Sequence, residues 1–524
     1  MRCSLHTPHG PGARASSRTR VVASGSARRR AVVARASGEQ PAAASAAPAR
    51  PEAAGAADAG AAGAPEARGA AGCPFLAALP PPPKASAPWY AWPLTILDPP
   101  AWQELAVGGR PVVAGEFLLQ PAVLACTGEL AREVLTSEGD KTAVGWPPHF
   151  AKLFGPESLI LQTGARHRAL RALMQPAFTT EAIAAFVPRV SEIVSGYLEA
   201  WAAAGGAVAG YEQLKLMTFD IIVQVVLGRP YSRAEIAELS SLYKAWLGGL
   251  FTVAPFDLPF LPYSRALRAR EALGVHLRAA VAEARAAAAA GEPPRGILGN
   301  MIKPDADGNG LTDQQCEDQI LLLLFAGHDT SSTTLARALW RLANAPAAWA
   351  ALKAEHAAAG GGGGAPDGAA LRSMPYTEAV IKEAMRCDNI IGGLPRRAAR
   401  DFDLGGHLVK EGQGLLVPLT YLTRHDPRWE GDASFEPARW LSEEGQQAAQ
   451  SWVMPFGAGN RYCIGAPLAM AEMKVFLSLL ARGYDYSIAD AANVKWSTIP
   501  LAVPKCGLPL TLTARRAAAA PAAA

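Results

Sequence analysis

The chain has 524 residues, of which 50% are hydrophobic and 18% charged, so it can bury a large apolar core and is neither disordered nor collagen-like. Its net charge is +4, but the first 38 residues hold eight arginines and no acid, which leaves a charge of −4 on the remainder. A mildly acidic body argues against nucleic-acid binding through a basic face. Seven scattered cysteines, none in a CxxC pair, indicate neither a disulfide framework nor a zinc site.

The N-terminal segment predicts a targeting signal followed by a linker. Residues 1–36 are rich in Arg, Ser and Ala and free of acid, which is typical of an organelle transit peptide, and a disordered basic tail is the alternative. We expect a chloroplast address, with the mitochondrion as the alternative. Residues 37–87 consist largely of Ala, Pro and Gly and predict a disordered linker. No apolar run reaches the ~20 residues of a bilayer-spanning helix, so at most peripheral membrane contact is expected.

Residues 88–516 predict one large domain that is mostly α with small β-sheets, and residues 517–524 predict a disordered tail. The apolar spacing predicts helices over Thr180–Ala204, Tyr211–Leu227, Ser232–Phe251, Tyr263–Ala290, Thr312–Ala345, Pro375–Arg386 and Pro467–Arg482. Strands are expected between Val112 and Leu119 and over Phe402–Val409, Leu415–Pro418 and Leu508–Leu512.

A basic helical segment, GARHRALR, begins at Gly164. His167 and Arg171 are one turn apart on one face, which suits a shared anion. An ordinary amphipathic basic helix is the alternative interpretation.

The helix predicted over Thr312–Ala345 has about 33 residues and spans roughly 50 Å. A TxxQ capping box opens it, and its centre, Ile320–Phe325, is apolar on every side, which predicts burial. The centre is followed by AGHDT, Ala326–Thr330. A mid-helix Gly costs about 1 kcal/mol, and a Thr can bend a helix by bonding to a carbonyl one turn back. This motif alone fits a kinked structural helix and a functional opening equally well.

Glu383 and Arg386 lie three apart on one helical face and can form a bidentate pair. Taken alone, such a pair carries little information. The segment FEPARW, which contains Arg439, follows later in the chain.

The segment PFGAGNRYCIGA, residues 455–466, frames Cys463 with three glycines directly before a helix. Glycines allow a tight loop whose N–H groups point at the sulfur, and the helix N-terminus should lower the pKa of the thiol. One thiolate cannot complete a zinc site but can hold a haem iron. The alternative, a small buried hydrophobe in a turn, fits the full FGxGxRxCxG string poorly.

Together these motifs resemble the haem-thiolate monooxygenases, the cytochrome P450 superfamily, over about residues 88–516. The resemblance implies the single-domain P450 fold, with haem b between the long helix and the thiolate loop and with Cys463 on the iron. It implies that Thr330 bonds to dioxygen while Asp329 feeds protons, that Glu383, Arg386 and Arg439 form a structural cluster, and that His328 is not a ligand. The remaining residues that it places at the haem are Phe456, Gly457, Arg461, Gly465, His167, Arg171, Arg396, Ala326 and Gly327.

After the ExxR pair the sequence departs from the family, which usually has a Leu and paired prolines where this chain reads CDNIIGGL. This stretch normally lines the substrate pocket, so Ile390, Ile391 and Gly392 are expected pocket residues. The segments LLLLFAGHDT, HRALRALMQPAF and MTFDIIVQVVLG look most like the branch that hydroxylates retinoids, sterols and related terpenoid hormones. The resemblance therefore implies an apolar, isoprenoid-derived substrate such as a retinoid, an apocarotenoid or a sterol-like molecule.

The expected activity is insertion of one atom of O2, with NAD(P)H-derived electrons from a ferredoxin-type or other reductase partner. The protein is expected to act as a monomer. Two alternatives stay open: a haem-thiolate isomerase or dehydratase acting on a hydroperoxide, and a non-catalytic haem-binding sensor.

Overall fold

The computed structural model describes residues 76, 78–85, 99–117, 120–252, 255–358, 366–425, 434–451, 454–497 and 502–515. Residues 76 and 78–85 fall within the predicted linker, and the other described residues follow it. All of the described residues belong to one unit of the chain, Ala70–Ala524. The predicted transit peptide and C-terminal tail lie outside the described residues and stay predictions.

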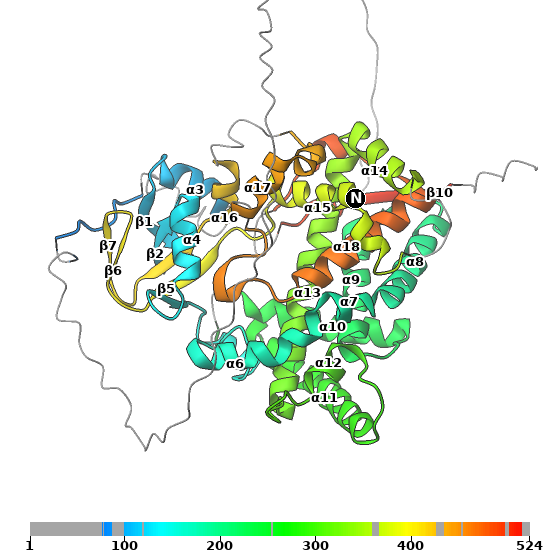
Figure 1. Ribbon diagram of the computed structural model, residues 1–524, viewed down its shortest axis with the longest axis horizontal. Helices are drawn as coiled ribbons and strands as arrows, with labels where there is room; N and C mark the ends of the chain where they lie inside the picture. Colours follow the sequence, from blue (N-terminus) through cyan, green and yellow to red (C-terminus); the bar gives the residue numbers. More distant parts are fainter. Residues whose placement is uncertain are drawn as a thin grey trace, which may run out of the picture. The chain divides into compact units, whose positions relative to one another are not determined.

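The described residues are mostly helical, as predicted, and the long helix α13 packs against helices from before and after it in the chain (Figure 1). The helices are α3 (Pro99–Val107), α4 (Gly128–Thr136), α5 (Phe150–Phe154), α6 (Gly164–Met174), α7 (Thr180–Ala184), α8 (Val187–Ala203), α9 (Gly210–Leu227), α10 (Arg233–Leu250), α11 (Pro262–Ala289), α12 (Gly296–Met301), α13 (Asp313–Ala343), α14 (Pro346–Ala358), α15 (Pro375–Cys387), α16 (Leu419–Arg424), α17 (Glu443–Ser451) and α18 (Ala466–Gly483). Short 3-10 turns are η2 (Gln175–Phe178), η3 (Ala370–Ser373), η4 (Pro437–Leu441), η5 (Gly459–Arg461) and η6 (Ala491–Asn493).

The predicted helices agree with these bounds to within two residues at each end, with one exception. The helix expected over Thr180–Ala204 is two helices, α7 and α8, separated at residues 185–186. Pro188, at the second position of α8, has no N–H to donate back into α7, so it suits the first turn of a new helix and not the middle of a longer one.

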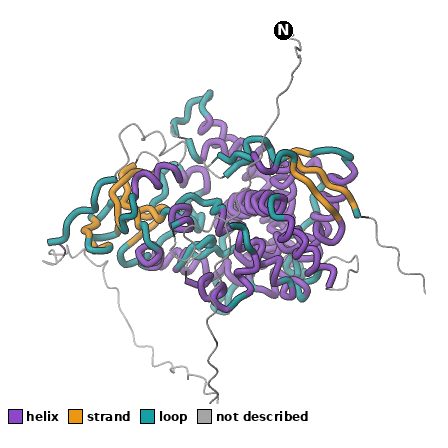
Figure 2. Tube along the Cα trace, turned by 90° about the horizontal axis from the view of Figure 1, so that it is seen from above, coloured by secondary structure: helices purple, strands orange, loops and turns teal. Residues whose placement is uncertain are grey.

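The strands form two separate small sheets and a hairpin. Figure 2 shows the strands in two places at opposite sides of the helices. One sheet has the order β1-β2-β8-β5-β3, the second has the order β4-β10-β9, and β6 pairs with β7. The bounds are β1 (Val112–Phe117), β2 (Gln120–Ala125), β3 (Thr142–Val144), β4 (Val208–Ala209), β5 (Leu394–Ala398), β6 (Phe402–Leu404), β7 (His407–Val409), β8 (Gly414–Val417), β9 (Tyr484–Ile488) and β10 (Pro509–Ala514).

Residues 80–85, which the sequence placed in the linker, pair with the first sheet. Ala114 of β1 donates to the carbonyl of Pro83 at 2.7 Å and accepts from the N–H of Ala85 at 2.8 Å. The carbonyl of Pro80 accepts from Leu408 of β7 at 2.9 Å. Proline lacks an N–H but keeps its carbonyl, so a proline run can still edge a sheet. The ordered body therefore begins before the predicted boundary at residue 88.

Helix α13 begins and is buried as the sequence predicts. Thr312 and Gln315 form the capping box, with the N–H of Gln315 on the Thr312 hydroxyl at 3.2 Å. Ile320 to Leu324 are buried, but Ala326 is exposed and Phe325 and Gly327 are half-buried, so one turn in the middle of the helix borders accessible space. Among the described residues, no helix combines the length and apolar character that crossing a bilayer requires.

Candidate functional site

The Cys463 loop is a tight turn held by its own backbone. Gly457 and Gly459 have positive φ angles of 73° and 65°, a conformation that glycine adopts without strain. The N–H of Cys463 donates to the carbonyl of Phe456 at 2.9 Å, and α18 begins three residues later. Gly465 has an ordinary negative φ, so its role differs: its N–H, with that of Ala466, points at the sulfur of Cys463. The loop thus holds one thiol at a helix N-terminus.

The predicted lowering of the pKa of Cys463 is wrong for the thiol as it stands in the chain. Burial raises the pKa, and the N–H groups of Gly465 and Ala466, together with the charge of Arg171, offset only part of this effect. The desolvation of a thiolate outweighs hydrogen bonds from a helix end. A bound cation deprotonates a coordinating thiol directly, so the site still fits an iron ligand.

The basic helix α6 lies against this loop, with His167 and Arg171 both directed toward it. Arg171 donates to the carbonyl of Tyr462 at 2.7 Å. His167 is 2% exposed, and burial, together with the charge of Arg461, lowers its pKa to about 4. His167 is therefore neutral at physiological pH and suits a hydrogen bond to an anion more than an ion pair.

Arg461, expected beside the haem, is held mainly by the protein. Its Nε atom lies 2.8 Å from Oε2 of Glu138, and its other nitrogens donate to the carbonyls of Leu159 and Gln162. Burial alone would raise the pKa of Glu138, but the hydrogen bond and charge of Arg461 lower it overall. Both side chains are nearly enclosed, at 5% exposure for Glu138 and 13% for Arg461.

Arg396 gives a direct test of whether these residues fit an anionic cofactor. It lies on β5 and is 8% exposed, and it donates from Nη1 to its neighbour's carbonyl at 2.8 Å. Its buried Nε atom has no hydrogen-bond partner within the described part of the chain. A buried guanidinium with an unused donor is costly unless an anion approaches it. Arg396 and His167 both interact electrostatically with Glu138, and Arg171 does so with Arg461, so these side chains form one basic region whose donors fit haem propionates.

The predicted structural cluster is present and complete. Glu383 is fully buried, and its carboxylate accepts from Arg386 at 2.8 and 2.9 Å and from Arg439 at 3.0 Å. The backbone N–H of Glu436 and the indole of Trp440 each donate to it at 2.9 Å. The sequence analysis did not identify Trp440, although it lies inside the FEPARW segment. Two arginines and two neutral donors satisfy both oxygens, so the cluster fixes η4 against α15.

On α13 the predicted opening is not a break in the helix, because the helix is continuous from Asp313 to Ala343. Thr330 is half-buried on the accessible turn and donates its hydroxyl to the carbonyl of Ala326 at 2.7 Å. Gly327 is explained by packing: a Cβ there would lie 2.7 Å from the Ile222 side chain on α9. The small residue thus allows the close approach of α9 to α13.

Asp329 points away from Thr330 into a network with two other helices. Its carboxylate lies 2.9 Å from Lys215 of α9, accepts from the Tyr243 hydroxyl of α10 at 2.9 Å, and lies 3.4 Å from the His328 ring. Burial alone would raise the pKa of Asp329, but hydrogen bonds and charge from His328 and Lys215 lower it well below its usual range. His328 is buried edge-on to Phe219 and Tyr243, so it packs and does not bind a metal.

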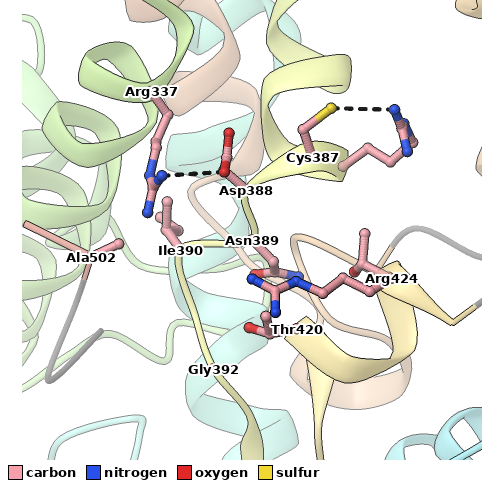
Figure 3. Close-up of a pocket in the computed structure, with 11 residues that line it drawn as sticks. Arg337, Cys387, Asp388, Asn389, Ile390, Gly392, Thr420, Arg424 and Ala502 are labelled. Atoms are coloured by element: carbon pink, nitrogen blue, oxygen red, sulfur yellow. Dashed lines mark hydrogen bonds and ion pairs between the residues drawn. The ribbon is translucent and has the colours of Figure 1, made fainter. Parts of the chain in front are cut away.

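The expected pocket residues do not share one apolar wall. Ile391 packs against the core beside the five-stranded sheet. Ile390 and Gly392 line a cavity with mainly polar neighbours (Figure 3). In that view Arg337 points to Asp388, at 3.2 Å, and Arg424 points toward Asn389 and Thr420. Asp388 also accepts from Arg341 at 2.6 and 3.0 Å.

Besides Trp440, four residues outside the predicted set shape the site. Lys215 and Tyr243 bind Asp329, Glu138 binds Arg461, and Arg337 binds Asp388. None stands in a recognisable motif. For these four residues the sequence offers one signal. Asp388 is an unusual acid directly after the ExxR pair, and if buried it needs a cationic partner, which Arg337 supplies.

The chain is similar in sequence to known proteins over most of its length. A sequence model described as "Cytochrome P450" matches residues 107–505. Abscisic acid 8'-hydroxylase 2 of Oryza sativa subsp. indica is 32% identical over 403 residues, 74% of this chain and 76% of the relative. Ent-kaurenoic acid oxidase of Oryza sativa subsp. japonica is 31% identical over 415 residues, 76% of this chain and 80% of the relative.

Among solved structures, the retinoic acid-bound cyanobacterial CYP120A1 superposes with a TM-score of 0.74 at 25% sequence identity. The match covers 84% of this chain and 100% of that chain. Because the superposition includes the whole of that protein, the helices and small sheets described above form a complete counterpart of its fold.

Proposed function

The chain belongs to the cytochrome P450 family, and we propose that it uses haem b to hydroxylate an apolar, isoprenoid-derived small molecule. It is a monooxygenase, as are its named relatives. The observation that carries the proposal is the Cys463 loop, where one thiol lies at a helix N-terminus beside a set of basic side chains.

Haem, when bound, supplies the activation of dioxygen and the insertion of one oxygen atom. Cys463 would hold its iron, and Arg396, Arg171 and His167 would receive its propionates. Thr330, on the accessible turn of α13, can orient a water molecule through its hydroxyl oxygen. Asp329 stays ionised and holds Lys215, whose ammonium group can carry a proton from the solvent side of α9.

The relatives support the isoprenoid class, and their names suggest its polar end. Abscisic, ent-kaurenoic and retinoic acid are all carboxylic acids, and each appears in the name of a similar protein or structure. The cavity of Figure 3 offers Arg424, Thr420 and the Asn389 amide beside the apolar Ile390. Such a lining suits a terpenoid acid better than a sterol.

We propose a ferredoxin-type protein as the electron donor. Arg168 is exposed on α6, as is Arg166, whose side chain is 62% exposed although it pairs with Glu157. Tyr462, next to the thiolate, is 46% exposed. A basic surface beside the thiolate favours an acidic partner. Turnover driven by an acidic ferredoxin should fall as salt is raised, and Arg168→Glu should weaken it further.

The chloroplast location also remains a proposal, and it rests on the composition of residues 1–36. A fluorescent protein fused after these residues should enter plastids. Entry into mitochondria would support the alternative location. Fluorescence that stays in the cytosol would show that residues 1–36 are not a transit peptide.

The central experiment is to purify the protein with haem, record the reduced carbonyl spectrum, and screen terpenoid acids and their methyl esters for displacement of the iron's water ligand. We expect a thiolate-type spectrum and product formation that needs both O2 and reductant. Product formed from a hydroperoxide without reductant would favour the isomerase alternative. Haem binding with no product from any tested class would favour the sensor.

A further inference from the structure

Glu138 lies where three parts of the haem site meet. It follows α4 and precedes β3, and β3 pairs with β5 so that Val144 faces Arg396. The end of α4 also contacts the Cys463 loop, because a Cβ on Gly459 would lie 2.6 Å from the carbonyl of Leu135. One acid thus lies between the thiolate loop and the strand that carries Arg396.

Glu138 accepts several hydrogen bonds from the guanidinium of Arg461. Nε lies 2.9 and 2.8 Å from the two carboxylate oxygens, and a further nitrogen donates to the same carboxylate. The remaining donations go to the carbonyls of Leu159 and Gln162, in the loop before α6. Arg461 is therefore fixed on three sides by the protein, two residues from Cys463.

The charges of this region balance only when Glu138 is included. Arg171, Arg396 and Arg461 bring three positive charges, while His167 is neutral. Two haem propionates bring two negative charges, and Glu138 brings the third. A buried cluster with an unmatched charge is strongly destabilised.

We propose that Glu138 is a positioning residue for the haem: it locks Arg461 as a brace between the thiolate loop and the loop before α6, and leaves Arg396, Arg171 and His167 to hold the propionates. This role goes beyond the proposed function, because it concerns cofactor retention and not the substrate. Glu138 touches neither iron nor substrate and acts through Arg461.

The test compares haem retention in Glu138→Gln, Glu138→Asp and the wild type. Haem transfer to apomyoglobin should be faster for Glu138→Gln by on the order of tenfold, because buried Arg461 donors lose their anion. The haem reduction potential of Glu138→Gln should shift to a more positive value, because a nearby negative charge is lost. Glu138→Asp keeps that charge and should keep the wild-type potential, whereas a purely structural role would make the shorter side chain at least as harmful.

Glu133→Gln is the matched control, since Glu133 lies on α4 and its half-buried carboxylate pairs with Lys141 at 2.7 Å. It should behave as wild type in both measurements. If Arg461 itself is the main propionate ligand, then Glu138→Gln should free it and slow haem loss. Slower or unchanged haem loss, or an unchanged potential in Glu138→Gln, would overturn the proposal. These readouts need no substrate, so they stand apart from the outcome for the proposed function.

Discussion

The thiolate side and the oxygen side of this site hold their buried acids in different ways. On the thiolate side, where the family resemblance places it, Glu383 binds residues of its own helix and of one later segment, and every contact lies within a motif. On the oxygen side, Asp329 is held by Lys215 and Tyr243, which come from two other helices. The first arrangement fixes a scaffold, and the second couples the ionised Asp329 and its lysine partner to the packing of α9 and α10.

Two sides of one site can therefore have separate sources of rigidity. Glu383 is fully buried with five donors from the protein, so nothing in its surroundings needs to move. Lys215 retains a 17% exposed side chain, so its end can reach solvent and return.

Cys463→Ser should abolish activity and the thiolate-type carbonyl spectrum, because a serine oxygen does not supply the electron density of a thiolate to iron. The spectrum of the reduced carbonyl complex measures this. Cys506→Ser, at an exposed cysteine, should change neither quantity. Full turnover in the Cys463 variant would show that Cys463 is not the iron ligand.

Glu383→Gln should lower the free energy of unfolding by about 3–5 kcal/mol, because it leaves the buried Arg386 without a matching charge. Urea unfolding of the haem-bound protein measures the change. Glu436→Gln alters a neighbouring acid whose side chain is 66% exposed, and should cost about 0–1 kcal/mol. Equal losses in the two variants would show that the scaffold does not depend on the buried acid.

Asp329→Asn should reduce product formation by about 100-fold while leaving haem binding intact, because it removes a proton-transfer group and not a ligand. Product formed per reductant consumed gives the measurement. Asp313→Asn, at the exposed start of the same helix, serves as the control and should retain wild-type turnover. A matching loss of haem would instead make Asp329 part of the scaffold, as Glu383 is.

Lys215→Met should have the smallest effect, about 1–2 kcal/mol at neutral pH, because Tyr243 and His328 still contact Asp329. The pKa of Asp329 is lowered in the folded protein, so its contribution to stability is present above its unfolded pKa and is lost as pH falls through the folded pKa. Without Lys215 that pKa rises, so acid unfolding should begin at a higher pH. Lys244→Met, whose side chain is 55% exposed, should leave the acid transition in place.

The features that short motifs encode could be predicted from the sequence. The Cys463 loop and the Glu383, Arg386 and Arg439 cluster are each formed by short segments whose spacing fixes their geometry. The helix bounds followed from apolar spacing in the same way, except where Pro188 starts a new helix. These features depend on contacts between neighbours in sequence or on a strong family signature.

The remaining features depend on which elements meet in the fold. Glu138 and Arg461 are 323 positions apart, and no pattern around Glu138 announces the pairing. Gly327 suggested a place for oxygen in the sequence, but the structure gives it a neighbour on α9 that no periodicity reveals. The run of four prolines at 80–83 has the composition of a linker, and composition does not show that its carbonyls will meet the edge of a strand.

The Thr330 hydroxyl owns a single hydrogen, and the Ala326 carbonyl already receives it at 2.7 Å. Toward the accessible turn of the helix this side chain therefore presents only lone pairs, and its O–H must turn about the Cβ–Oγ bond and leave that carbonyl before it can act as a donor. Valine in its place would keep the shape of the side chain and remove the oxygen. The backbone carbonyl of Ala326 thus sets the hydroxyl orientation from which Thr330 must start.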